Sequence, residues 1–391
     1  MPRNNRQSIN LLSNSQGFSL VELMVALVIT LILLSGIGQI FLSSKKSFTI
    51  QDSLARQQEN GRYALDSVAQ DLRRAGYWGG NSDVSRIEGT LGLTDNGVDR
   101  GTCSNDTNWG RMLETRIFGL NDEKTGYACI PGTGADFAYE RGDVLVVRYA
   151  APYSIGGTTT PDYEANRLYI RSDLFYGRIF QGKDEDKTEN EIPSPERIVA
   201  FDDDGACPDG TPYTPPGEAD PTGCLLNVNL STIRSSELKS NAYYIGKSGR
   251  QCAGEDVPSL FRIALDEQGQ PGIEEIAYGV DQFQVRYGID TDINPADEDM
   301  LFGDGTVDEY RNADEINLDT DYDDGVPPAS PHWGQVIAAR IWILVRAECE
   351  ETGYNNTNSY PIGDLVNAAA YTPADSYRRQ LYQTTVKLRN R

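Results

Sequence analysis

The stretch that decides the fold is GFSLVELMVALVITLILLSGIGQIF, residues 17–41. Glu22 is its only charged residue, and almost all the others are apolar. At 1.5 Å per residue, a helix over residues 23–40 is roughly 27 Å long, about the thickness of one bilayer core. The run is longer than the apolar segment of a secretory signal peptide, and no small-residue cleavage site closes it. We therefore expect a membrane-spanning helix over residues 18–41.

The helical pattern continues beyond this apolar run. Apolar residues recur near helical spacing at Leu54, Leu65, Val68 and Leu72, with Ala64, Ala69 and Ala75 between them. Charged residues fall on the other faces, at Arg56, Glu59, Arg62, Asp66, Asp71 and Arg73. Because Gly76 is a natural helix stop, we predict one helix over about residues 18–75, roughly 87 Å long. Its second half is expected to pack against a globular domain.

Glu22 is the unusual residue of the apolar run. A carboxylate near the start of a membrane span costs a few kcal/mol, so such a residue is expected to have a function and a partner. The alternative is that Glu22 only extends toward the lipid headgroups.

The composition limits the possible partners. The chain has 391 residues, of which 39% are hydrophobic, so a sizeable core can form. Its formal net charge is −23, from 58 acidic and 35 basic residues. An acidic surface repels phosphate, so we expect no nucleic acid partner. Divalent cations and a basic protein partner remain open.

The cysteines indicate the compartment of the globular part. Six are present, at Cys103, Cys129, Cys207, Cys224, Cys252 and Cys349. None forms a CxxC pair, and His332 is the only histidine, so a zinc site is not expected. An even, well-spread set favours disulfides in an oxidising compartment over free buried thiols, which places the C-terminal bulk outside the cytoplasm.

The connectivity of these cysteines is open, because six cysteines allow fifteen pairings. We expect Cys103–Cys129 and Cys207–Cys224, which close short loops in turn-rich segments. The third expected pair is Cys252–Cys349, which ties a loop after one strand to the end of another.

The run Gly17-Phe18-Ser19-Leu20-Val21-Glu22-Leu23 resembles the processing site of type IV pilins and type II secretion pseudopilins. A short polar leader precedes the run and a long apolar helix follows it. The resemblance implies that a prepilin peptidase cuts between Gly17 and Phe18 and methylates the new amine of Phe18. It also implies that Glu22 pairs with the Phe18 amine of a neighbouring subunit, which agrees with the need of a buried carboxylate for a cation.

Other segments resemble the PilW family of minor pilins. They are 61–65 (GRYAL), 71–79 (DLRRAGYWG), 242–246 (AYYIG), 258–262 (PSLFR), 285–290 (VRYGID), 341–346 (IWILVR) and 382–390 (YQTTVKLRN). The resemblance implies a structural subunit that rests in the inner membrane before it enters the pilus. Its implied partners are other minor pilins, the major pilin, the prepilin peptidase and a tip adhesin. The implied role is to prime pilus assembly from a complex at the filament tip.

Two alternatives to this role stay open. One is a type II secretion pseudopilin, and the other is a membrane-anchored, calcium-dependent adhesion or binding module.

The remaining sequence predicts a domain built on a β-sheet. Strand-like runs cover 143–150, 167–171, 224–230, 259–265, 273–280, 282–290, 336–346 and 380–388, and several alternate apolar and polar residues. We expect an α+β fold in which a long N-terminal helix packs on an antiparallel β-sheet domain, pilin-like and with inserted loops. The expected parts are a leader (1–17), the pilin helix (18–76, with 18–41 in the membrane) and a β-rich periplasmic or extracellular domain (77–391).

The sequence does not indicate an enzyme. GxSxG, HExxH and GxGxxG motifs do not occur, and His332 has no nucleophile motif beside it. The acidic stretch 290–324 is the single candidate for a bound cofactor, because its carboxylate spacing suits calcium. Asp319, Asp321 and Asp323 form its better trio, and the alternative is a solvated acidic loop. No other cofactor is expected.

Overall fold

The structure is a computed structural model that describes residues 17, 19–81, 84–90, 107–125, 127–153, 163–164, 166–172, 177–182, 234–292, 303–316, 332–363 and 370–390. It has two compact units, one up to Ala55 and one from Arg56. A single helix, α1 (Leu20–Arg74), contributes residues to both units. It ends at Gly76, whose φ of +75° is readily adopted by glycine, and the Gly76 amide donates to the Arg148 carbonyl.

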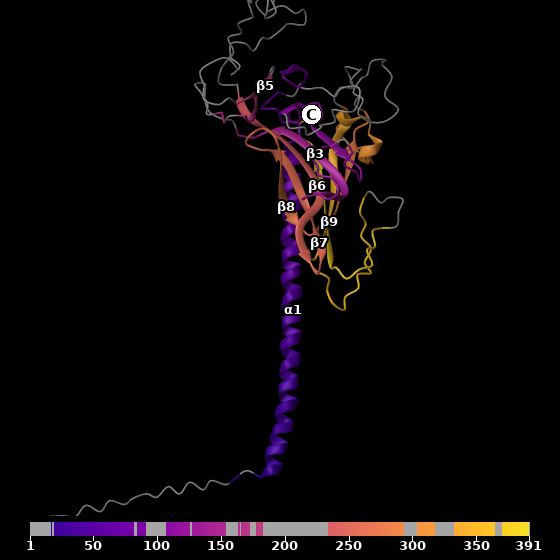
Figure 1. Cartoon of the computed structure of the whole chain (residues 1–391). Helices are drawn as coiled ribbons and strands as arrows, with labels where there is room; N and C mark the ends of the chain where they lie inside the picture. Colours follow the sequence, from indigo (N-terminus) through magenta and orange to yellow (C-terminus); the bar gives the residue numbers. More distant parts are fainter. Residues whose placement is uncertain are drawn as a thin grey trace, which may run out of the picture. The chain divides into compact units, whose positions relative to one another are not determined.

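Within the described residues of the second unit, the strands form a larger sheet and a smaller sheet (Figure 1). The larger sheet has the order β1-β5-β4-β6-β3-β2, with β7 paired to β6 and β8 paired to β7. Its strands are β1 (Ile87–Glu88), β2 (Ile117–Leu120), β3 (Tyr139–Ala150), β4 (Leu168–Ser172), β5 (Gly177–Gln181), β6 (Arg234–Cys252), β7 (Glu255–Leu265) and β8 (Pro271–Tyr278). All its pairs are antiparallel except β1 with β5.

The smaller sheet is antiparallel and has the order β10-β9-β11-β12. Its strands are β9 (Val280–Ile289), β10 (Glu309–Arg311), β11 (Val336–Arg346) and β12 (Arg379–Lys387). β12 pairs with β11 over its whole length, from Arg379 opposite Arg346 to Lys387 opposite Ala338.

One hydrophobic core joins the second half of α1 to both sheets. It includes Ala64, Val68 and Leu72 of the helix, Tyr243 of the larger sheet and Ile341 of the smaller sheet. The helix contributes small or medium side chains at the seam, so its backbone comes close to the strands. The predicted α+β fold, a long helix with antiparallel sheets, is confirmed.

A buried carboxylate fastens the two sheets to each other. Asp281 of β9 is 1% exposed and accepts hydrogen bonds from Arg379 Nε (2.7 Å) and Arg141 Nη1 (3.2 Å). Arg379 also makes two bonds to the carboxylate of Asp375. Since a buried charge is tolerated only when it is paired and hydrogen-bonded, these contacts fix β3, β9 and β12 relative to one another.

Candidate functional site

The residues of the predicted processing site begin the described chain. Gly17, Ser19 and Leu20 are exposed, and Phe18 lies outside the described residues. Glu22 stands in the first turn of α1, where its Oε2 accepts from the Ser19 amide at 3.3 Å. A carboxylate there is favoured by the positive end of the helix dipole. The Glu22 side chain is exposed and can accept a cation from another molecule.

The first half of α1 presents an apolar surface on all sides. Its large apolar residues from Leu20 to Phe48 are between 53% and 76% exposed. Its polar group at Thr30 is satisfied within the helix, because Oγ1 donates to the Ala26 carbonyl at 2.7 Å. Among the described residues, α1 is long and apolar enough to cross a membrane. Such a surface requires lipid or neighbouring apolar helices around it.

The second half of α1 is fastened by a buried carboxylate that the sequence pattern did not identify. Asp71 was expected on a polar outer face, but it is 4% exposed and faces the larger sheet. Its Oδ1 accepts from the Tyr149 hydroxyl at 2.7 Å. Its Oδ2 accepts from the Tyr243 hydroxyl at 2.6 Å and from Asn241 Nδ2 at 2.5 Å. The expectation was wrong because three donors from β3 and β6 replace the water that a surface aspartate would bind.

These contacts also change the acidity of the two tyrosines. Burial and then the negative charge of Asp71 raise the pKa of Tyr149 and of Tyr243 above the ordinary value. Both hydroxyls therefore keep their protons and serve as donors over the whole physiological range. The arrangement stabilises the position of the helix and has no nucleophile, so it is a structural site.

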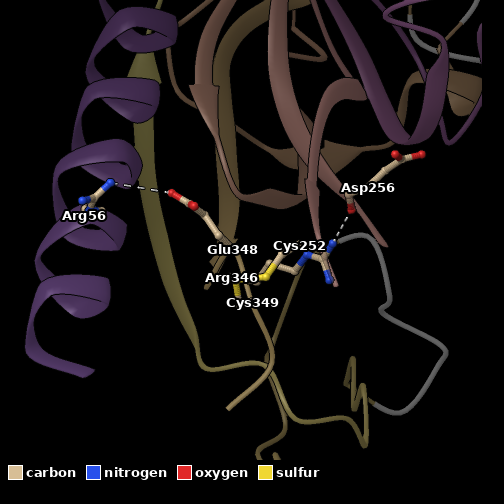
Figure 2. The surroundings of a disulfide bond; sticks show 6 residues. All are labelled: Arg56, Cys252, Asp256, Arg346, Glu348 and Cys349. Atoms are coloured by element: carbon tan, nitrogen blue, oxygen red, sulfur yellow. Dashed lines mark hydrogen bonds and ion pairs between the residues drawn. A yellow bond between two sulfur atoms is a disulfide. The ribbon is translucent and has the colours of Figure 1, made fainter. Parts of the chain in front are cut away.

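The structure contains the expected disulfide between Cys252 and Cys349, which lie 97 residues apart in the sequence (Figure 2). Nearby, Arg346 Nη2 donates to the Asp256 carbonyl at 2.8 Å. Glu348, the residue before Cys349, faces Arg56 of α1 at 4.0 Å between Arg56 Nη1 and Glu348 Oε1. Since both of these side chains are about half exposed, the ion pair itself contributes little.

The other cysteine predictions are largely outside the described residues. Cys129 is disulfide-bonded, but Cys103, Cys207 and Cys224 are not described. The pairs Cys103–Cys129 and Cys207–Cys224 therefore stay predictions.

The predicted calcium trio, Asp319, Asp321 and Asp323, also lies outside the described residues. The structure instead brings together Asp290, Asp292 and Asp308, whose ligand oxygens lie within 4.8 Å of one another. Asp290 is buried, and its Oδ2 accepts from the Gly305 amide at 2.9 Å. The charge of Asp308 and then burial raise the pKa of Asp292. Carboxylate oxygens at this spacing suit a hard cation.

The sequence could have nominated two of these three carboxylates. Asp290 and Asp292 belong to one acidic run, but Asp308 reaches them only because the chain turns back after β9. In that turn the Asp308 amide donates to the Ile289 carbonyl at 2.9 Å, and the Thr291 amide donates to Asp308 Oδ2 at 2.8 Å.

His332 has a structural position. It is 3% exposed at the start of a short 3₁₀ turn, where its Nδ1 accepts from the Gly334 amide at 3.1 Å. Burial, and then the nearby charge of Arg116, lower its pKa to about 4. The imidazole is therefore neutral at physiological pH.

Two protein-family models match parts of this chain. The family described as type IV pilus-assembly protein W, or PilW, matches residues 242–390. The prokaryotic N-terminal methylation motif matches residues 12–38. A search of curated proteins gave no significant match. Among solved structures, a type IV-like pilin from Thermus thermophilus aligns over 66% of this chain and 81% of its own, with 12% identity and a TM-score of 0.23.

The two family matches cover the two ends of the molecule described above. The methylation motif spans Gly17, Glu22 and the start of the apolar half of α1, and indicates prepilin peptidase processing, membrane anchoring and entry into a pilus. The PilW match spans β7, β8, β9, β11 and β12 and most of β6, including the disulfide. Both matched families belong to structural pilus subunits, not to enzymes. The chain is therefore a type IV pilin-like protein that carries an N-terminal methylation motif and a match to the PilW family over residues 242–390.

Proposed function

We propose that this chain is a minor pilin that joins other minor pilins in a short complex at the tip of the type IV pilus and primes its assembly. In this proposal residues 1–17 are a leader, and residues 18–76 are the pilin helix, with 18–41 in the inner membrane before assembly. Residues 77–391 form the domain on the outer side of that membrane. The major pilin and a tip adhesin are the further partners.

The observation that carries the proposal is the uncovered apolar half of α1, with Glu22 in its first turn. In a filament, neighbouring helices would cover this surface. The energy for association would then come from helix packing, for which the chain needs no catalytic group.

Glu22 would make assembly more favourable than the membrane-bound monomer. Cutting after Gly17 creates an ammonium group on Phe18, which methylation keeps positively charged. A lone carboxylate in lipid costs a few kcal/mol, and that cost falls when a neighbour's Phe18 ammonium comes within hydrogen-bonding distance. At the end of a filament, where no neighbour lies ahead, the chain's own Phe18 amine could take this place.

Processing can be tested first. Gly17→Ala should leave the uncut precursor in the membrane, whereas Gly36→Ala, a glycine substitution within the apolar run, should still be cut. Mass spectrometry of the purified chain should find methylated Phe18 at the mature N-terminus. An N-terminus at Met1, or a cut after residue 40, contradicts the proposal.

Assembly is tested on cells with Glu22→Ala and Glu22→Gln. The alanine variant should insert and fold but co-purify less with other pilins, and the glutamine variant should be intermediate because it keeps hydrogen bonding. Sheared pili are then analysed for this chain by mass spectrometry. Normal recovery of Glu22→Ala in pili would mean that the carboxylate has no part in assembly. Recovery with a secretion pseudopilus instead would favour the type II secretion alternative.

A second candidate function, calcium-dependent binding, is favoured by the cluster of Asp290, Asp292 and Asp308. Calcium would accept carboxylate oxygens from all three. Titration calorimetry of the full chain with calcium chloride tests this, with Asp308→Asn as the variant that removes one charged ligand. The exposed Asp314→Asn, outside the cluster, is the matched control. Equal calcium affinity in the wild type and Asp308→Asn would reject this cluster as the site.

A further inference from the structure

β12 is an edge strand of the smaller sheet, and one of its edges has no strand partner among the described residues. The other edge pairs with β11. The Leu388 amide, just past the end of β12, donates to the Ile337 carbonyl at 2.8 Å. In an antiparallel pair the backbone groups alternate in direction along the strand. The N–H and C=O groups of Gln383, Thr385 and Lys387 therefore point away from β11, toward the free edge.

The two faces of β12 differ, and α1 covers only one of them. Val386 and Leu388 are buried in the core, and Tyr382 packs on Gly61 of the helix. The side chains of Gln383, Thr385 and Lys387 are exposed on the other face. The residues that aim backbone groups at the free edge are thus also the residues whose side chains are open to solvent.

Two surface hollows lie along β12, and Thr385 lines both of them. The first has a volume of about 420 Å³ and is lined by Arg73, Thr385, Val386, Lys387, Leu388 and Arg389. The second, of about 380 Å³, is lined by Arg340, Trp342, Gln383, Thr384 and Thr385. Consecutive residues of β12 line both hollows, which is expected where a strand edge is open.

The charge of this edge is opposite to that of the whole chain. The first hollow is lined by three basic residues and by no acidic one, whereas the chain has a net charge of −23. Arg73 and Arg389 are exposed, and among the described residues neither forms an ion pair. In the second hollow Arg340 lies over the Tyr310 ring at 4.2 Å and donates to Thr385 Oγ1, and within the described part of the chain no carboxylate pairs with it.

We propose that the free edge of β12 binds an extended acidic segment of another polypeptide, which adds to the smaller sheet as a further strand. Backbone groups of Gln383, Thr385 and Lys387 hydrogen-bond the added strand, as in β-strand addition. Arg73 and Arg389 attract its carboxylates, while Arg340 contacts it from the outer face; the Lys387 ammonium donates to the Gly305 carbonyl at 2.8 Å. The inference deepens the proposed function, because a neighbouring pilus subunit would supply the segment.

The probe is a fluorescein-labelled peptide of eight residues that alternates valine and glutamate, with a valine–lysine peptide of the same length as its control. Fluorescence anisotropy measures binding to the full chain in detergent micelles. The acidic peptide should bind and the basic peptide should not, and raising the salt concentration should weaken binding because exposed charges are screened. Amide hydrogen exchange should slow in residues 381–389 when the acidic peptide is bound.

Two pairs of variants separate the backbone contribution from the charge contribution. Thr385→Pro removes an amide that points to the free edge and leaves the β11 ladder intact, so it should abolish peptide binding, whereas Thr385→Ala keeps that amide and should bind. Arg73→Gln with Arg389→Gln should weaken binding about tenfold or more, whereas Arg234→Gln, an exposed arginine of the larger sheet, should not. The thermal midpoint of each variant reports whether it is folded.

Several results would overturn the inference: no binding of the acidic peptide, equal binding of both peptides, or normal binding by folded Thr385→Pro. Self-association of the chain through residues 381–389 without peptide would assign the edge to a second copy instead. These outcomes leave the filament proposal standing, because processing at Gly17 and the effect of Glu22→Ala are measured separately. Conversely, if the chain is absent from pili but still binds the acidic peptide, the inference about β12 holds and the proposed pilus role does not.

Discussion

The two parts of α1 share one backbone conformation but have opposite surroundings. Up to Ala55, large apolar side chains such as Leu23 and Ile32 are exposed. From Arg56 on, a stripe of mostly small or medium residues is buried, at Gln57, Gly61, Ala64, Val68, Ala69, Asp71 and Leu72. The helix pattern alone therefore does not determine what a segment contacts. Side-chain size and the polar partners available to each part determine it.

The buried part owes its position to specific contacts, whereas the exposed part offers a uniform apolar surface. Small residues at a helix–sheet seam allow close approach, and Asp71 adds directional hydrogen bonds. The exposed part presents mostly leucine, isoleucine and valine, and Glu22 is the only charged residue within residues 17–41. Changes in the buried part should therefore affect the stability of the domain, and changes in the exposed part should not.

The largest expected effect comes from the disulfide, which belongs to the same unit as the buried part of α1. Replacing Cys252 and Cys349 together by serine removes a crosslink between residues 97 apart in sequence. In the loop-entropy description this costs about 4–5 kcal/mol of unfolding free energy. Guanidinium unfolding of the full chain in micelles, followed by tryptophan fluorescence, measures the loss. The helical signal of the apolar part should persist through that transition, and an unchanged midpoint would mean that the disulfide adds no constraint.

Asp71→Ala is expected to cost about 3–4 kcal/mol, because it leaves two tyrosine hydroxyls and an amide buried without their acceptor. Asp66→Ala is the matched control on the same helix. Asp66 is exposed and bonds only Gln70 among the described residues, so its loss should change stability by less than about 0.5 kcal/mol. The same unfolding experiment compares both. If the two substitutions reduced stability equally, Asp71 would have no special part in holding the helix against the sheet.

Acid should weaken the domain and leave the apolar part of α1 unaffected. His332 has its pKa lowered to about 4 by burial, while in the unfolded chain it has the ordinary value near 6.5. Between these values the unfolded chain binds the additional proton, so stability falls as the pH falls. The loss is about 2 kcal/mol by pH 5 and about 3 kcal/mol by pH 4.

His332→Asn gives the control for this effect. Asparagine keeps an acceptor for the Gly334 amide but does not titrate. Denaturant midpoints of this variant should therefore stay nearly constant from pH 6.5 to 5, above the range where carboxylates take up protons. A wild-type midpoint that is flat in the same window would contradict the lowered pKa.

The sequence predicted the elements with clear periodicity. The helix expected over residues 18–75 is α1, and the alternating runs at 143–150, 259–265, 282–290, 336–346 and 380–388 are β3, β7, β9, β11 and β12 in large part. None of the expected strand runs falls on β6. Its residues Ser235, Ser236, Ser240 and Asn241 are polar and buried, so no apolar alternation marks it. Such a strand is identifiable only from its partners, for example Asn241 donating to Asp71.

The candidate sites also differ in whether their residues are contiguous in the sequence. Gly17, Phe18 and Glu22 could be predicted, because processing motifs are contiguous in sequence. The Asp71 site could not, because it joins residues from separate elements, and within the acidic stretch 290–324 the sequence did not single out Asp290, Asp292 and Asp308. A carboxylate on a polar-looking helix face gives no indication in sequence that Tyr149 and Tyr243 lie opposite it.

The smallest expected effect compares two glycines of α1. A Cβ on Gly61 would overlap the ring of Tyr382, whereas a Cβ on Gly38 would meet nothing within 4 Å. Alanine in place of glycine stabilises a helix by about 1 kcal/mol, which opposes the cost of the overlap at Gly61. The ring of Tyr382 is partly exposed and can shift, so Gly61→Ala should destabilise the domain by only about 1–2 kcal/mol net. Gly38→Ala should leave the domain's denaturant midpoint unchanged.

If the domain were as stable with Gly61→Ala as without it, the seam between helix and sheet would need no small residue at that position. A shift with Gly38→Ala would mean that the exposed part of α1 contributes to domain stability, and the contrast between the two parts of the helix would not hold.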